Sequence, residues 1–455
     1  MKKHVKFAFI GAGSVSFCPA TIVDILQNKS FVEVEIEISL MDINPEPLEL
    51  SRSFCEKIAN RMGRTPRITA TTDLCKAISG ADFVITAIEV ERYHYWSQDF
   101  HIPRRYGFRQ IYGENGGPGG MFHTLRNLPP LLEIARMMEK ECPDAWMLNY
   151  TNPEAKLVEG ISRLSNIKVV GLCHGEIIGR GQLSAFLELP MERIAYKSVG
   201  LNHFGWFTKI WDRETGEDLY SRLREAERNA DPLAQWDEWA LPRIMLRTYG
   251  LWPYPGANHI GEYFAWSDSL LAGALPQFYH DPVADNLWQS AKKPPPFIYS
   301  FSSNPTNREL FTKHTDDWKN SFDSEREITG SGEYGIPIAE AIFFDIPTEI
   351  GAVNLPNKGY AKDLPEGMVI ELPAMVDGKG IHPHPSDVLP TAIAQMIAAQ
   401  GAIHKLVIDA YEEKSRNKLL QAVLLDPTVS NYYNAVAMIN EMCDLQNGIL
   451  PELNW

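Results

Sequence analysis

The sequence lacks several features that would assign it to a special class of protein. Its six cysteines are scattered without a C-x-x-C pair, which indicates small buried thiols and a reducing, cytoplasmic setting. No stretch approaches the roughly 18 uninterrupted apolar residues of a membrane helix, so we expect no membrane association. Acids outnumber bases, and the formal net charge of -15 argues against a nucleic-acid partner. Internal repeats and low-complexity linkers are also absent.

What remains is the composition of an ordinary globular protein. The chain has 455 residues, of which 44% are apolar and 22% charged, and this length predicts two closely packed domains. The first residues, MKKHVKFAFIGAG, begin like a signal peptide, but the apolar run passes into glycine without a small-residue cleavage site. We therefore expect a first β-strand here.

The first half of the chain alternates apolar strands with amphipathic helices. Helices are predicted at residues 16–27, 45–60 and about 121–141, between strands that include ADFVITAIEV, DAWMLNYTNP and IKVVGLCHG. Such alternation predicts an α/β fold, with a Rossmann-like, doubly wound parallel sheet covered on both faces. We assign residues 1–195 to this domain.

The pattern changes from about residue 196. We interpret YKSVGLNHFGWFTKIW as one long, bent strand and PEGMVIELPAMVDGKGI as a hairpin with a glycine-containing turn. The tail from about residue 390 is predicted to form amphipathic helices. Residues 196–455 are therefore assigned to a second, α+β domain for substrate binding and oligomerisation, packed against the first.

A dinucleotide-binding pattern follows the first strand. In FIGAGSVSF, Gly11 and Gly13, with Ser14 beside them, permit a tight turn and the close approach of a pyrophosphate to a helix N-terminus. Ser16 replaces the third glycine of the usual pattern. Asp42 ends the next strand, where a carboxylate accepts both ribose hydroxyls of NAD and repels the 2′-phosphate of NADP. Asp42 could instead cap the following helix, but together these residues predict that domain 1–195 binds NAD.

Two further loops are rich in glycine or asparagine. Five glycines lie between residues 113 and 120, before a predicted helix, and either form a flexible loop or let backbone N–H groups approach an anion or cofactor. In NYTNP, Asn149 and Asn152 either serve as turn residues or bind the hydroxyls of a nicotinamide ribose or a sugar. We take Asn149 as a candidate for cofactor binding and Asn152 for substrate binding.

A thiol and an imidazole follow another buried strand. Cys173 and His174 lie where ligands bind in a parallel sheet, and Asn202 and His203 follow at another expected strand end. These side chains are too few for a closed structural zinc site, but they suit an open divalent site completed by substrate oxygens and water. Cys173 and His203 are thus candidate metal ligands, with a buried thiol and a turn residue as the alternatives.

The motifs occur in an order that resembles one enzyme family. FIGAGS, MDIN, GGPGGMFHTLR, PDAWMLNYTNP, GLCHG and GLNHFGW together resemble the NAD- and manganese-dependent glycosidases of glycoside hydrolase family 4. Weaker similarities in HIGEYFAW, NLPNKGY and ELPAMVDGKGI extend the resemblance through most of the chain. The resemblance implies the fold shared with lactate and malate dehydrogenases, with NAD and Mn²⁺, or another divalent metal, as cofactors.

The resemblance also implies a redox-assisted elimination. NAD takes hydride from C3 of the sugar, the C2 proton is removed, the C1 leaving group departs, water adds, and the hydride returns. Cys173 and His203 would hold the metal, and His174 is the candidate acid for the leaving group or a substrate-binding group. The base is left open among Tyr254, His259 and a metal-bound water, because WPYPGAN departs from the family pattern before HIGEY.

The residues after the cysteine suggest the substrate class. Cys-His-Gly resembles the α-galacturonidase and α-glucuronidase members of the family, and Gly175 leaves room for a carboxylate at C6 of the sugar. A guanidinium should bind that carboxylate, so we take Arg105 as the candidate, with Arg109 and Arg180 as other sources. Asn202 is also assigned to substrate binding.

Other interpretations stay open at this point. The chain could be a neutral-sugar α-glucosidase or α-galactosidase of the same family. It could also be an NAD-dependent dehydrogenase of the 2-hydroxyacid type, which would release NADH and need no metal held by Cys173. An inactive NAD-binding sensor would lose the metal pair, which this sequence keeps. The resemblance further implies a homodimer or homotetramer acting on a small sugar substrate.

Overall fold

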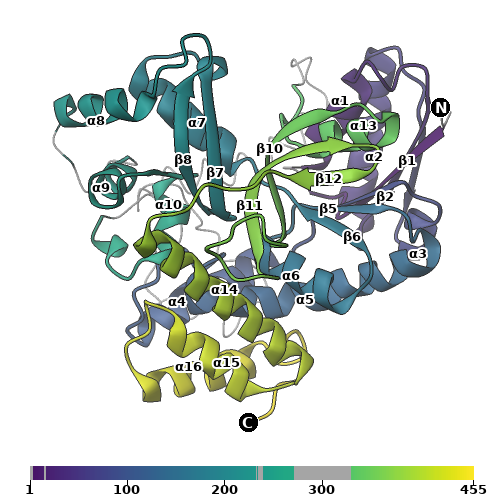
Figure 1. Cartoon of the computed structure of the whole chain (residues 1–455). Helices are drawn as coiled ribbons and strands as arrows, with labels where there is room; N and C mark the ends of the chain where they lie inside the picture. The colour runs from purple at the N-terminus through teal and green to yellow at the C-terminus, as the bar shows by residue number, and fades with distance from the viewer. Residues whose placement is uncertain (1–3, 15–16, 232, 234–238, 271–328) are drawn as a thin grey trace, which may run out of the picture.

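A computed structural model describes residues 4–14, 17–231, 233, 239–270 and 329–455 (Figure 1). Within these residues, twelve strands form one continuous sheet in the order β3-β2-β1-β4-β5-β6-β10-β11-β7-β8-β9, with β12 paired to β11. The strands are β1 (His4–Ile10), β2 (Glu35–Met41), β3 (Arg67–Thr71), β4 (Phe83–Thr86), β5 (Trp146–Asn149), β6 (Lys168–Gly171), β7 (Ile194–Leu201), β8 (Phe204–Asp212), β9 (Trp252–Tyr254), β10 (Thr348–Pro356), β11 (Val369–Asp377) and β12 (Gly380–Pro383).

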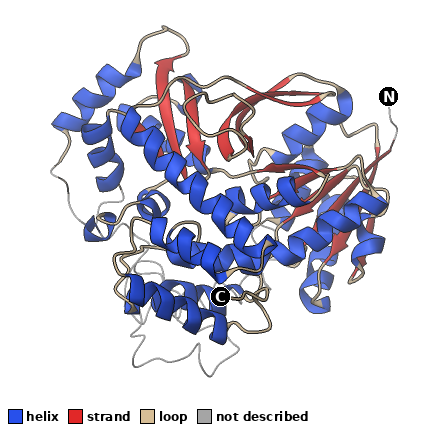
Figure 2. Ribbon diagram, turned by 60° about the horizontal axis from the view of Figure 1, so that its bottom comes forward, coloured by secondary structure: helices blue, strands red, loops and turns tan. Residues whose placement is uncertain are grey.

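Helices pack over the sheet (Figure 2), and the last helices of the chain gather below it, near the C-terminus (Figure 1). They are α1 (Cys18–Gln27), α2 (Pro45–Arg61), α3 (Leu74–Ile78), α4 (Arg92–Arg105), α5 (Gly117–Glu141), α6 (Glu154–Leu164), α7 (Gly175–Leu187), α8 (Leu219–Asn229), α9 (Ala240–Tyr249), α10 (Ala257–Ile260), α13 (Gly335–Phe344), α14 (Thr391–Glu412), α15 (Arg416–Leu425) and α16 (Tyr432–Leu445). Short 3-10 turns occur at Met191–Arg193, Gly261–Tyr263 and Ser267–Leu270.

The first six strands form the predicted Rossmann-like sheet. β1 pairs in parallel with β2 on one side and β4 on the other, and the parallel pairing continues to β3 and to β5 and β6. Every residue of β1 after His4 and of β2 after Glu35 is buried, as expected for strands covered on both faces. The predicted fold class is confirmed. Helix α5 begins at Gly117, earlier than predicted, because Pro118 suits the first turn of a helix.

The antiparallel half of the sheet continues from the parallel half. Asn354 of β10 pairs with Gly171 of β6, so the strands after residue 195 extend the same sheet. The apolar core that contains Phe7 and Ile22 also contains Ile338 of α13 and Val353 of β10. Side chains from both predicted domains thus share one core. The boundary between residues 195 and 196 stays a prediction.

One predicted element is wrong. YKSVGLNHFGWFTKIW is not one bent strand but a hairpin of β7 and β8, in which Leu201 pairs with Phe204 across a two-residue turn. The turn consists of Asn202 and His203, and His203 adopts a φ of 63°. The turn is difficult to predict from the sequence, because neither of its two residues is glycine or proline and apolar residues continue on both sides. The hairpin predicted for PEGMVIELPAMVDGKGI is confirmed as β11 and β12.

Helix α14 is the one helix in the described part of the chain that is long and apolar enough to cross a membrane, judged by length and composition alone. It packs against α5, α6 and α15, and half of its most apolar window is buried inside the protein. These are the properties of a core helix. The predicted helical tail is confirmed by α14, α15 and α16.

Candidate active site

The glycine turn after β1 lies against Asp42. The N–H of Gly13 donates to Asp42 Oδ2 at 2.9 Å, and the N–H of Asn44 donates to Asp42 Oδ1 at 2.9 Å. The N-terminal cap of α2 is Asn44. The structure therefore brings Asp42 to the glycine turn, as a site for an adenosine ribose requires.

Glycine is required at both positions of this turn. Gly11 has a φ of 89°, and a Cβ there would lie 2.3 Å from the carbonyl oxygen of Ala87. A Cβ on Gly13 would lie 2.8 Å from Asp42 Oδ2. The N–H of Ser14 donates to the carbonyl oxygen of Gly11 at 3.0 Å and closes the turn. Ser16 lies outside the described residues. The bare backbone beside a carboxylate fits the pyrophosphate and ribose of NAD.

The glycine-rich segment 113–120 is buried and held in place by a carboxylate. Glu262 Oε1 accepts the backbone N–H groups of Glu114 at 2.7 Å and of Asn115 at 3.1 Å. The N–H of Gly119 donates to Gln110 Oε1 at 3.0 Å. Burial, followed by the Glu114 carboxylate, raises the pKa of Glu262 to about 8. These hydrogen bonds fix the backbone of the segment, and its side chains therefore extend from fixed positions.

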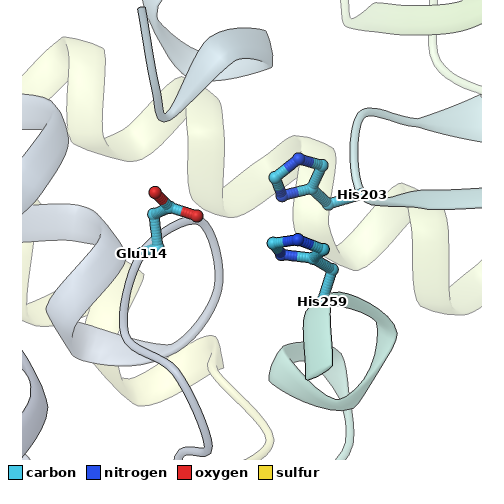
Figure 3. A group of neighbouring side chains, drawn as sticks. All are labelled: Glu114, His203 and His259. Atoms are coloured by element: carbon cyan, nitrogen blue, oxygen red, sulfur yellow. The ribbon is translucent and has the colours of Figure 1, made fainter. Parts of the chain in front are cut away.

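Three side chains with metal-binding atoms meet at this segment. The ligand atoms of Glu114, His203 and His259 all lie within 4.8 Å of one another (Figure 3). The two imidazole rings lie 4.0 Å apart between centroids, at an interplanar angle of 36°. Carboxylate and imidazole suit Mn²⁺ and related divalent cations. The group joins two predicted residues, His203 and His259, to Glu114, which the sequence analysis missed because one acid among glycines shows no recognisable spacing.

His203 is buried in surroundings that keep its ring neutral. Burial lowers its pKa well below the ordinary value, and the charges of His259, His174 and Lys156 lower it further. Neutral imidazole is the form that binds metals. Asn115 Nδ2 lies 2.9 Å from His203 Nδ1. With the amide group reversed, Asn115 Oδ1 would accept a hydrogen bond from Nδ1–H, and His203 Nε2 would carry no proton and could bind a cation.

Cys173, the other predicted metal ligand, lies half-buried just after β6 and outside the group of Glu114, His203 and His259. Burial and then the Glu371 carboxylate raise the pKa of its thiol well above the ordinary value, whereas a hydrogen bond from the Asn202 side chain lowers it. Asn202 also donates to Glu371 at 3.4 Å, and its buried Oδ1 has no hydrogen-bond partner within the described part of the chain. Asn202 therefore links Cys173 to the turn that carries His203, and it offers an oxygen to a ligand.

His174 and Gly175 lie at the start of α7. His174 Nδ1 is 2.7 Å from Glu333 Oε1, and this hydrogen bond raises the pKa of His174. A Cβ on Gly175 would lie 3.3 Å from Pro255 Cβ and 3.6 Å from Cys173 Sγ. Gly175 thus keeps a narrow gap open between Pro255 and the thiol.

The predicted asparagines at the end of β5 make internal contacts. Asn149 Oδ1 accepts from Thr86 Oγ1 at 2.9 Å, and Asn149 Nδ2 donates to the carbonyl oxygen of Thr151 at 3.0 Å. The carbonyl oxygen of Asn152 accepts from Asn127 Nδ2 at 2.9 Å. The Asn149 side chain therefore shapes the loop after β5.

Tyr254 is fully buried in the apolar core formed by α7, β8 and α8. Its ring lies 4.7 Å from that of Phe207, between centroids. Burial raises the pKa of Tyr254 well above its ordinary value, and the Glu371 carboxylate raises it further. The structure brings His259 into the group with His203, whereas the Tyr254 ring packs in this core and against Gly205 of β8.

Each arginine considered for a substrate carboxylate pairs with an acid of the chain. Arg105 lies at the surface and pairs with Glu441 of α16. Arg109 pairs with Asp268 at 2.6 Å, and Arg180 pairs with Glu176 at 2.7 Å. The structure does not bring Arg105 to the group around His203.

The structure contains both a dinucleotide-binding turn and a group of metal-binding side chains. Comparison with known proteins identifies the family to which the chain belongs. Residues 6–189 match the model described as family 4 glycosyl hydrolase, and residues 198–429 match the C-terminal domain of that family. The chain is a family 4 glycosyl hydrolase. This glycosyl hydrolase is 31% identical to an α-glucosidase of Erwinia rhapontici, over 99% of each chain.

Two other relatives bear on the fold and the substrate. The family 4 chain is 27% identical to an α-galacturonidase of Thermoanaerobacter italicus, over 97% of this chain and 96% of the relative. A solved 6-phospho-α-glucosidase from gut microorganisms, in complex with NAD and Mn²⁺, covers 100% of both chains with a TM-score of 0.80 and 23% identity. The fold is therefore that of the family 4 enzymes.

Proposed function

We propose that this family 4 glycosyl hydrolase is an NAD- and Mn²⁺-dependent α-glycosidase that acts on uronides, either α-galacturonides or α-glucuronides. The observation that carries the substrate class is the Cys-His-Gly sequence at the start of α7, which leaves position 175 without a side chain beside Cys173. The α-galacturonidase relative supports the same class.

When bound, NAD accepts and returns the C3 hydride, and the divalent cation polarises the oxygens on C2 and C3. Gly11, Gly13, Ser14 and Asp42 are the residues that would bind NAD. Cys173 and His203 would hold the cation, with Glu114 and His259 within reach of His203. The orphaned Oδ1 of Asn202 supports a ligand at this place, because a buried amide oxygen without a partner is costly.

The chain also supplies candidate proton carriers. His174 is the proposed acid for the leaving group, since half of its side chain is exposed beside the thiol of Cys173. His259 is the preferred base for the C2 proton, because it lies against His203 whereas Tyr254 is enclosed in an apolar core. A solvent-derived base remains the alternative.

The choice of a carboxylate over a phosphate rests on the Cys-His-Gly sequence. Gly175 places no side chain between Pro255 and the thiol of Cys173, where even one added Cβ would be tightly packed at 3.3 Å from Pro255 Cβ. Arg105, Arg109 and Arg180 already pair with acids of the chain, so an arginine that binds the substrate carboxylate has to leave its acid partner.

A neutral-sugar α-glucosidase is the second candidate, because the α-glucosidase of Erwinia rhapontici is 31% identical over 99% of both chains. The Cys-His-Gly sequence argues for the uronide instead. The cytoplasmic setting and the homodimer or homotetramer stay predictions made from the sequence.

A substrate panel tests this proposal. The enzyme, with NAD, Mn²⁺ and a thiol reductant, is offered p-nitrophenyl α-glycosides of galacturonic acid, glucuronic acid, glucose, galactose and glucose 6-phosphate. We expect kcat/KM to be about 100-fold higher for a uronide than for the matching neutral sugar, because a polar site left unpaired penalises the analogue. Faster cleavage of a neutral or phosphorylated sugar would overturn the uronide assignment.

Two controls separate the reaction classes. Removal of NAD, or of the cation with a chelator, should abolish p-nitrophenol release from every substrate. NADH should not accumulate, because the hydride returns in each cycle. Stoichiometric NADH formation without p-nitrophenol release would instead indicate a dehydrogenase.

A further inference from the structure

A buried carboxylate lies against His174 from a distant part of the chain. Glu333 Oε1 is 2.7 Å from His174 Nδ1. The Glu333 side chain is only 6% exposed, whereas that of His174 is 50% exposed. The contact therefore joins a buried acid to a half-exposed imidazole ring.

The segment that carries Glu333 is anchored at several points. The N–H of Ser331 donates to both carboxylate oxygens of Asp24 on α1, at 3.1 Å each, and the N–H of Glu333 donates to Ser331 Oγ at 3.0 Å. The N–H of Gly335 donates to the hydroxyl of Tyr150 at 3.0 Å. These bonds tie the segment to the parallel half of the sheet, so Glu333 reaches His174 from a rigid support.

The hydrogen bond decides which nitrogen of His174 faces the substrate side. A carboxylate only accepts hydrogen bonds, so Nδ1 of His174 carries a proton and is held by Glu333. Nε2 is then the nitrogen left for a substrate, and half of the His174 side chain is exposed. Carboxylate partners of this kind orient catalytic and metal-binding histidines by fixing the tautomer and the ring plane.

We propose that Glu333 is a positioning residue that holds His174 so that Nε2–H meets the oxygen of the leaving group. The inference rests on the proposed function, in which His174 is the acid. As the C1–O1 bond breaks, its electron pair goes to O1, which takes the Nε2 proton and leaves as an alcohol, while the electron pair left on C2 by deprotonation forms the C1–C2 double bond. Water then adds to C1, the electron pair of the double bond returns to C2, and the proton released by the water goes to Nε2. The hydrogen bond from Nδ1 to Glu333 persists through both steps.

Leaving groups of different acidity test this role. The variant Glu333→Gln keeps the size of the side chain but removes the carboxylate. It is assayed with the methyl and the p-nitrophenyl α-glycoside of the sugar that the wild-type enzyme cleaves fastest. We expect kcat/KM for the methyl glycoside to fall about 100-fold, the usual contribution of general acid catalysis. The p-nitrophenyl glycoside should change little, because p-nitrophenolate departs without a proton.

A double variant tests whether Glu333 acts through His174. In a His174→Ala background, Glu333→Gln should cause no further loss with the methyl glycoside, because the group that it positions is gone. Equal losses on both leaving groups, or an additional loss in this background, would overturn the proposal and indicate a merely structural carboxylate.

Controls keep the result interpretable. Glu340→Gln on α13 removes a carboxylate that binds Asn28, away from His174, and should leave both substrates unaffected. NAD affinity and Tm, measured for each variant, show whether the protein is folded. If the wild-type enzyme cleaves neither glycoside, the proposed function fails. If it cleaves both and Glu333→Gln matches it on both, only the role of Glu333 fails.

Discussion

Cys173 lies in surroundings that oppose a thiolate. Burial and the Glu371 carboxylate both raise the pKa of its thiol, whereas hydrogen bonds from the Asn202 side chain and the Gly175 backbone lower it. A divalent cation reverses this balance, because a coordinated thiol loses its proton. At the scale of single residues, the site therefore requires a cation before Cys173 can act as a ligand.

This dependence gives a prediction for Cys173→Ala. We expect Mn²⁺ affinity and turnover to fall by more than about 100-fold, since even outer-shell changes cost metal sites 10- to 100-fold. NAD affinity should stay near that of the wild type, because Gly13 and Asp42 are unchanged. Isothermal titration with Mn²⁺ and with NAD measures both.

A matched pair of variants places the cation. Cys75→Ala changes a half-buried thiol on α3 and should leave both affinities unchanged. Normal Mn²⁺ binding by Cys173→Ala, combined with lost binding by Glu114→Gln, would contradict the assignment to Cys173. It would move the cation to the group of Glu114, His203 and His259.

At the scale of elements, one buried ion pair ties three helices together. Arg126 of α5 and Asp99 of α4 are fully buried and lie 2.6 Å apart between nitrogen and oxygen. Gln446, at the end of α16, accepts from Arg126 at 3.0 Å and donates to Asp99 at 3.2 Å. A buried pair of this kind is sensitive to the loss of one partner, because the other charge is left without compensation.

We therefore expect Arg126→Ala to lower the free energy of unfolding by about 3 to 5 kcal/mol. Urea denaturation followed by circular dichroism measures the change. The double variant Arg126→Met with Asp99→Leu should recover part of the loss, because no buried charge remains. Arg52→Ala, which breaks exposed pairs on α2, should have little effect. Equal effects of Arg52→Ala and Arg126→Ala would contradict this account.

At the scale of the whole molecule, the core does not stop at residue 195. Ile336 and Ile338 of α13 and Val353 of β10 pack in the same cluster as Phe7 and Ile22. The family models also divide the chain near this point, at residues 189 and 198. The sequence therefore divides into two parts near residue 195, but side chains from both parts build one shared core.

The shared core predicts the behaviour of a fragment. Residues 1–195, expressed alone, lack α13 and β10 and would expose the apolar face that these elements cover. We expect the fragment to show no cooperative thermal transition and no NAD binding, whereas the full chain shows both. Near-ultraviolet circular dichroism and NAD titration check this. A fragment that folds and binds NAD would show that the predicted boundary is also a folding boundary.

The sequence by itself determined the parallel sheet, the glycine turn and the position of Asp42 at the end of β2. It did so because these features depend on local patterns: an apolar run, a tight turn, and an acid at the next strand end. It also placed Cys173 and His174 directly after β6, where the structure has them. These features depend on short segments of the sequence, so they can be predicted without knowing which distant residues are in contact.

Only the tertiary structure decided which distant side chains meet. His203 lies in a two-residue turn that contains no glycine, and the fold places it against His259 and Glu114. Glu333 reaches His174 across 159 positions of the chain. Arg105, a reasonable partner for a carboxylate in sequence, is held at the surface by Glu441. Contacts of this kind depend on how packed elements converge, which local patterns do not encode.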